Sequence, residues 1–106
     1  MVYSAAAWAF DWDPPYTDAI NTIADLGFKG IELRIQGSKD LEYYSDKTNR
    51  ELRKLMDSRG LTLTNLNYTP GGASRPKAEE RKAAVKDFET VITAAKQLGP
   101  DLITLG

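Results

Sequence analysis

The side chains of this sequence that could do chemistry are aromatic, amide and charged groups near the ends of three short apolar segments. They are Trp8, Phe10 and Trp12 in the first segment, Glu32 and Arg34 in the second, and Asn65 and Asn67 in the third. Aromatic rings can cover the C–H face of a sugar, while amides, a carboxylate and a guanidinium can bind its hydroxyls or a phosphate. We therefore predict that these residues bind a polyol, a sugar or a sugar phosphate.

Each of these groups also has a purely structural interpretation. The aromatic residues Trp8 and Phe10 could belong to the hydrophobic core. Glu32 and Arg34 stand two apart on a strand, so they could form an ion pair inside a closed sheet. Two asparagines near the end of a strand could organise a turn.

Composition excludes several kinds of site and partner. The chain has 106 residues, with no His and no Cys. The commonest metal ligand, the commonest general base and every thiolate site are therefore missing, and we expect no cofactor in this chain. The net charge of −1 gives no reason to expect a nucleic acid or a membrane as partner. No apolar segment is long enough to span a membrane and no signal segment is visible, so we expect a cytoplasmic location.

The elements that position these groups are set by a recurring pattern of helix, glycine and strand. A helical apolar stripe ends at Leu26, Gly27 can adopt the left-handed conformation that stops a helix, and the segment Ile31–Ile35 alternates apolar and charged residues. The same pattern recurs at Gly60 and at Gly99. Repeated βα units are therefore predicted.

The predicted order is β-α-β-α-β-α-β. The strands fall within 2–9, 31–35, 61–68 and 102–105, with three helices between them, and all 106 residues form one domain. The segments 36–47 and 69–74 are predicted loops, Thr48 with Glu51 forms a capping-box pattern, and Pro76 is expected to begin the third helix. Such alternation implies an α/β fold with parallel strands.

Two features favour a barrel wall over a doubly wound sheet. One face of the predicted sheet is apolar, and the other carries small and polar residues such as Glu32, Arg34 and Thr104. No helix follows the last strand in this sequence, so that strand is expected to be a bare edge, as is the first. A flavodoxin-like module, with helices on both faces and a non-sequential strand order, is the alternative fold.

Three segments resemble the sugar phosphate isomerase/epimerase family of xylose-isomerase-like TIM barrels. The segment 19–33, which contains Leu26-Gly27-Phe28-Lys29-Gly30-Ile31-Glu32-Leu33, is similar to the first helix and second strand of that family. The segments 51–61 and 94–103 are similar to its second helix and third strand and to the run into its fourth strand. The resemblance implies that this chain supplies the first four strands of a (βα)8 barrel.

The resemblance also implies a division of labour between the two halves of such a barrel. In the family, the ligands of a divalent metal and the acid/base carboxylates lie mainly on later strands, so only Glu32 and the aromatics after the first strand match substrate-side positions. We therefore expect an isolated or engineered half-barrel that is inactive alone and forms a homodimer. The alternatives are a small isomerase or epimerase that is active as a dimer with Glu32 as acid/base, a flavodoxin-like non-catalytic module, and a dimer that exchanges helices.

Overall fold

A computed structural model describes residues 3–69 and 78–105 of the chain. The strands are β1 (Ser4–Ala6), β2 (Gly30–Gln36), β3 (Thr62–Thr69) and β4 (Leu102–Leu105). The helices are the 3-10 helix η1 (Ala7–Ala9) and the α-helices α1 (Thr17–Asp25), α2 (Gly37–Leu41), α3 (Asp46–Ser58) and α4 (Ala78–Leu98). The predicted alternation of strands and helices is confirmed.

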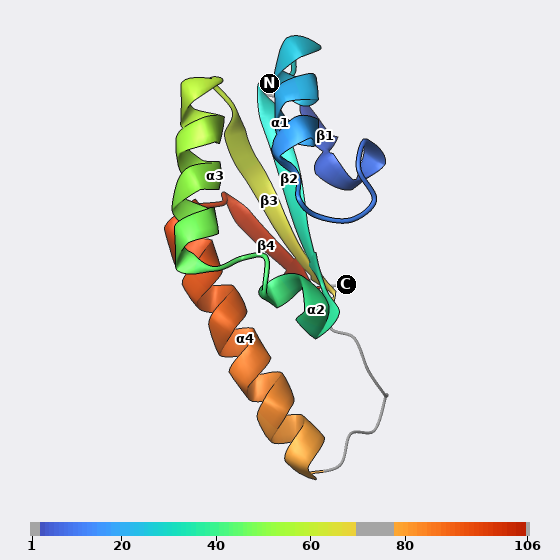
Figure 1. Cartoon of the computed structure of the whole chain (residues 1–106), viewed down its shortest axis with the longest axis vertical. Coiled ribbons are helices and arrows are strands. Elements are labelled where there is room, and N and C mark those ends of the chain that lie inside the picture. Colours follow the sequence, from blue (N-terminus) through green and yellow to red (C-terminus); the bar gives the residue numbers. More distant parts are fainter. Residues whose placement is uncertain (1–2, 70–77, 106) are drawn as a thin grey trace.

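The four strands form one parallel sheet in the order β1-β2-β3-β4. Sequential order with right-handed crossovers is the topology of a TIM barrel wall. A flavodoxin-like fold requires a strand order that departs from the sequence, so that alternative is wrong. Figure 1 shows the strands side by side, with α1 and α3 along the sheet and the long α4 extending past its end.

The hydrophobic core lies between the sheet and one layer of helices. Ile31, Leu33 and Ile35 of β2 are fully buried, and they pack against apolar residues that α1, α3 and α4 direct toward the sheet. Helix α3 packs against α4 and also contacts α1, so the helices lie on the same side of the sheet. The opposite face of the sheet therefore carries the polar residues, and we call it the polar face.

A β-bulge in β3 decides which residues reach the polar face. Ile31 pairs with Leu63, but the next residue of β2, Glu32, pairs with Asn65, so Thr64 is an extra residue in β3. An inserted residue shifts the alternation of every later side chain by one position. As a result Leu63 and Leu66 both face the core, which strict alternation would forbid.

The glycines predicted to stop helices do so. Gly27, Gly60 and Gly99 have φ angles of 93°, 67° and 68°, in the left-handed region that other residues rarely adopt. At Gly27 and Gly60 no atom lies within 4 Å of an added Cβ, so backbone conformation alone selects glycine there.

Three local predictions are wrong. The first strand ends at Ala6 rather than Ala9, because Ala7 begins a turn of 3-10 helix in which Phe10 and Asp11 donate their N–H groups to the Ala7 carbonyl. The predicted loop 36–47 contains the short helix α2, whose Asp40 carboxylate accepts the N–H of Gln36 at 2.8 Å.

The third error concerns the start of α3. Ser45, not Thr48, is the N-cap, and its hydroxyl oxygen accepts the N–H of Thr48 at 3.3 Å. A Ser three residues before a Thr offers the same cap chemistry as the predicted pair, so the sequence pattern did not fix the position. The predictions for residue 2 and for 70–77, including Pro76, lie outside the described residues.

Candidate functional site

The guanidinium of Arg34 lies between two tryptophans at the carboxyl end of β2. Its Cζ is 5.3 Å from the ring centroid of Trp8 and 4.8 Å from that of Trp12. Its Nη2 donates a hydrogen bond to the main-chain carbonyl of Trp12 at 2.7 Å. Only 8% of Arg34 is exposed. Arg34 therefore fixes the loop after β1 onto the sheet, and we call Trp8, Arg34 and Trp12 the arginine clamp.

Three tyrosines support the clamp from the core side. The hydroxyl of Tyr44 donates to the carbonyl of Arg34 at 2.8 Å, and the hydroxyl of Tyr43 accepts the N–H of Tyr16 at 3.2 Å. Burial raises the pKa of Tyr16, Tyr43 and Tyr44, and the guanidinium of Arg34 opposes this shift at Tyr16 and Tyr44. The three hydroxyls consequently stay protonated at neutral pH and can serve as donors.

A hydrogen-bonded relay runs across the middle of the polar face. The Asn65 side-chain Nδ2 donates to Glu32 Oε1 at 3.3 Å and to Thr104 Oγ1 at 3.1 Å. The Thr104 hydroxyl in turn donates to Asn67 Oδ1 at 3.2 Å. We call these four residues the polar relay; it links three neighbouring strands, β2, β3 and β4.

The carboxylate of Glu32 determines which groups of the polar relay donate hydrogen bonds and which accept them. Because an ionised carboxylate only accepts, Glu32 fixes the amide of Asn65 with its nitrogen toward β2. The other side of that amide, Asn65 Oδ1, is buried without a hydrogen-bond partner. Thr104 uses its proton on Asn67 Oδ1, which leaves the Asn67 amide nitrogen as a donor. The face thus presents one donor, the Asn67 amide nitrogen, that a hydroxylated ligand could satisfy, whereas Asn65 Oδ1 has almost no exposed surface.

A further polar pair closes the amino end of the same face. The hydroxyl oxygens of Ser4 and Thr64 lie 2.6 Å apart, and Thr64 also donates to the carbonyl of Ile31 at 3.2 Å. Ser4 and Thr64 belong to strands on either side of β2, where Gly30 pairs with Ser4 and has no side chain to separate them. The bulge at Thr64 therefore has a polar function on this face as well as a packing function.

The structure brings six of the seven predicted site residues into these two groups. Trp8, Trp12 and Arg34 form the clamp, and Glu32, Asn65 and Asn67 belong to the polar relay. Phe10, which is 42% exposed, takes part in no ring contact or side-chain hydrogen bond among the described residues. It is therefore not a core residue.

The purely structural interpretations, which were a core role for the aromatics, an ion pair and a turn, have different outcomes in the structure. Trp8 is partly buried against the core, whereas Trp12 is 67% exposed. In the contacts of the described residues, Glu32 and Arg34 bond to different partners, so they do not act as a simple ion pair. Asn65 and Asn67 bond across strands rather than within a turn.

Thr104 is the site residue that the prediction left out. Its position on the polar face was visible in the alternation of β4, but its pairing with Asn67 depends on the register between β3 and β4. The residues of β3 that pair with β4 follow the bulge at Thr64, so the bulge determines which of them faces Thr104. No local sequence pattern indicates that bulge. Tyr16 was missed because it precedes α1 in a segment rich in proline and aspartate.

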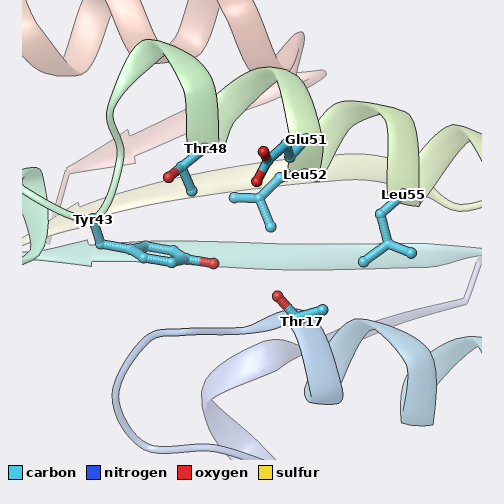
Figure 2. Close-up of a pocket in the computed structure, with 6 residues that line it drawn as sticks. All are labelled: Thr17, Tyr43, Thr48, Glu51, Leu52 and Leu55. Atoms are coloured by element: carbon cyan, nitrogen blue, oxygen red, sulfur yellow. The ribbon is translucent and has the colours of Figure 1, made fainter.

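A separate pocket of 220 Å³ lies on the helical side of the molecule. Figure 2 shows Thr17 of α1 and Tyr43 facing Thr48, Glu51, Leu52 and Leu55 of α3 across it. It is a groove between two helices, on the opposite side of the sheet from the polar relay, and it contains no residue of the clamp or of the relay.

The described residues do not assemble a metal site. No group of three or more His, Cys, Asp or Glu side chains within 3–69 and 78–105 is placed to hold a metal ion. Glu32 is the carboxylate of the polar relay, and its recorded partner is an amide rather than a second carboxylate. The residues in these two ranges offer a divalent metal no set of ligands, so we derive no step through one. In the same part of the chain, no helix is long and apolar enough to cross a membrane.

Comparison with known proteins agrees with this geometry. Residues 20–106 match the family described as the xylose isomerase-like TIM barrel. The crystal structure of the probable 3-DHS dehydratase AsbF from Bacillus anthracis, involved in petrobactin synthesis, superposes with a TM-score of 0.68 at 19% sequence identity. The alignment covers 99% of this chain and 38% of that structure. The sequence has no significant match among curated proteins.

Proposed function

Because the chain belongs to the xylose isomerase-like TIM barrel family, we propose that its polar face is the substrate-binding wall for a sugar or sugar phosphate. In parallel α/β folds, ligands bind at the carboxyl ends of the strands. The arginine clamp stands at that end of β2, and the polar relay crosses the helix-free face from Glu32 of β2 to Thr104 near the end of β4. Their position and chemistry both support this proposal.

The single observation that carries the proposal is the polar relay, which leaves the amide nitrogen of Asn67 as a free donor on the helix-free face. A sugar hydroxyl can accept a hydrogen bond from this amide nitrogen. The exposed ring of Trp12 offers an apolar surface for the C–H face of the same ligand.

We further propose that this chain alone binds without turning substrate over. Moving a proton next to a carbonyl requires a base and a group that stabilises the resulting oxyanion. Glu32 has the chemistry of a base, but Arg34, the nearest cation along β2, is committed to the carbonyl of Trp12. The residues that would complete a catalytic site would have to come from the other strands of a closed barrel.

An active dimer with Glu32 as acid/base is the second candidate function. It is favoured by the hydrogen bond that holds the half-buried carboxylate of Glu32 in one orientation. A symmetric dimer would place two such carboxylates in one site. This candidate differs from the first in requiring measurable isomerisation or epimerisation.

Ligand titration monitored by NMR tests the first proposal. Addition of ketoses and their phosphates is expected to shift the side-chain amide signals of Asn65 and Asn67 and the indole signal of Trp12. Asn67→Leu is expected to weaken binding about tenfold, which corresponds to one lost hydrogen bond of about 1.4 kcal/mol. Thr48→Val is the matched control. Thr48 lines the groove between α1 and α3, on the other side of the sheet, so this variant should bind like the unmodified chain. Absence of these shifts at millimolar ligand would refute the assignment.

Turnover distinguishes the second candidate from the first. The same sugars are incubated with the protein, with and without a divalent cation, and the products are separated by chromatography. Conversion that disappears in Glu32→Gln would establish the active dimer. Binding without conversion is the result that we expect.

A further inference from the structure

We propose that the polar face selects an uncharged polyol and discriminates against a phosphate, with Glu32 as the residue that determines this selectivity. The selectivity rests on the function proposed above, because it narrows the ligand class of the same site. It applies to the part of a ligand that lies against the four described strands.

The guanidinium of Arg34 is the obvious partner for a phosphate, because the four described strands contain no other Lys or Arg. Two neighbouring nitrogens of a guanidinium form the forked hydrogen bond by which arginine binds a phosphate. Every such pair includes either Nε, which is buried, or Nη2, which already donates to the carbonyl of Trp12 at 2.7 Å. The clamp therefore does not offer a phosphate the fork of Arg34.

Carboxylates outnumber this cation at the carboxyl end of β2. Burial raises the pKa of Tyr16, and the guanidinium of Arg34 opposes that shift. The carboxylates of Asp40 and Asp13 add to the shift, so three charged groups lie near one phenol. Asp40 is only 3% exposed and accepts the N–H of Gln36 at 2.8 Å, which holds its charge in place. Two carboxylates and one guanidinium leave a net negative charge beside the clamp, and this charge opposes the approach of an anion.

Glu32 places a third carboxylate on the polar face itself. It stands two residues before Arg34 on β2, so both side chains belong to the same side of the sheet. Its half-buried carboxylate accepts a hydrogen bond from the amide of Asn65 at 3.3 Å. A phosphate ester carries a charge of about −2 at neutral pH. At a separation of roughly 8 Å, repulsion by Glu32 is sufficient to weaken its binding about tenfold.

The same groups suit the hydroxyls of an uncharged polyol. A carboxylate has about four lone-pair sites, so Glu32 can accept from a ligand hydroxyl as well as from Asn65. Thr104 donates to Asn67 Oδ1 at 3.2 Å, which leaves the amide nitrogen of Asn67 to donate to a hydroxyl oxygen. Glu32 therefore attracts a hydroxyl and repels a phosphate at the same position.

Comparison of a neutral ketose with its phosphate tests this selectivity. Fructose and fructose 6-phosphate are titrated separately into the 106-residue chain, and the side-chain amide signals of Asn65 and Asn67 give the two dissociation constants. We expect fructose 6-phosphate to bind about tenfold more weakly than fructose. The difference should shrink as the salt concentration rises from about 0.05 to about 0.5 M, because ions screen the repulsion.

Glu32→Gln tests whether Glu32 is the residue responsible. Glutamine keeps an acceptor for the Asn65 amide but has no charge, so the two dissociation constants should come within about threefold of each other. Glu51→Gln is the matched control, because Glu51 lines the groove between α1 and α3 on the other side of the sheet (Figure 2). The same loss of charge there should leave the preference unchanged. The ratio of two constants measured on one variant is insensitive to a general loss of affinity.

The outcomes separate the selectivity from the proposed function. If neither sugar shifts the amide signals, the proposed function fails and the selectivity fails with it. If fructose 6-phosphate binds as tightly as fructose or more tightly, the face binds sugars but the selectivity is wrong. A preference for fructose that persists in Glu32→Gln, or that disappears equally in Glu51→Gln, would refute the role of Glu32.

Discussion

Replacing Arg34 by methionine tests whether the arginine clamp holds the loop after β1 in place. Methionine has a similar length but no charge and no donor. The substitution removes the hydrogen bond to the carbonyl of Trp12, at 2.7 Å, and the contacts with the rings of Trp8 and Trp12. The loop would then lose its main polar attachment to the sheet.

The structure sets the size of the expected effect. A hydrogen bond from a charged group contributes about 1.5–3 kcal/mol, and partly buried cation–π contacts contribute about 0.5–2 kcal/mol. Relief of the cost of burying a charge offsets part of this sum. We therefore expect a loss of about 1–3 kcal/mol from the free energy of unfolding. That is a large fraction of the roughly 5–15 kcal/mol available to a domain.

Urea denaturation followed by tryptophan fluorescence measures this loss directly. The chain has two tryptophans, and both contact Arg34, so the probe reports on the clamp itself. Arg59→Met is the matched control. Arg59 pairs with the exposed carboxylate of Asp25 at the surface, and such pairs contribute about 0–1 kcal/mol.

One result would refute the reasoning. If Arg34→Met lowers stability no more than Arg59→Met does, and if the native emission of the tryptophans is unchanged, the clamp does not hold the loop. Arg34→Lys refines the test, because lysine keeps the charge but lacks the planar group that stacks between two rings. It should fall between the unmodified protein and Arg34→Met.

Three further predictions concern stability. Asn49 is 1% exposed and donates to the carbonyl of Tyr44 and to Gln97, so Asn49→Leu should cost about 2–3 kcal/mol in urea unfolding; a loss below 0.5 kcal/mol would contradict this. Burial raises the pKa of Tyr44 in the folded state. The contribution of Tyr44 to the free energy of unfolding is therefore complete below about pH 10 and is lost as the pH rises further. Tyr44→Phe should flatten the alkaline decline in melting temperature, and an unchanged pH profile would count against this. Gly60 has a φ of 67°, so Gly60→Ala should lower stability by about 1 kcal/mol and Gly60→Asn by less; equal losses would argue against a backbone cause.

The sequence alone determined the order of the elements and the topology that follows from it. Helices that end at Gly27, Gly60 and Gly99 and strands that alternate apolar and polar residues are local patterns, and local sterics enforce them. Short connections and the fixed hand of crossovers then leave few ways to arrange four parallel strands. The half-barrel topology was predictable for that reason, whereas the family was predicted from the resemblance of three segments to its members.

Only the tertiary structure decided how the polar side chains are paired. The bulge at Thr64 sets which residues of β3 face Glu32, and the clamp forms because a loop from β1 folds back over Arg34. Both depend on packing between segments distant in the sequence, where a shift of one residue reverses the face that a side chain occupies. Spacing along the chain could identify the candidate residues, but partners across strands are fixed only when the sheet is assembled.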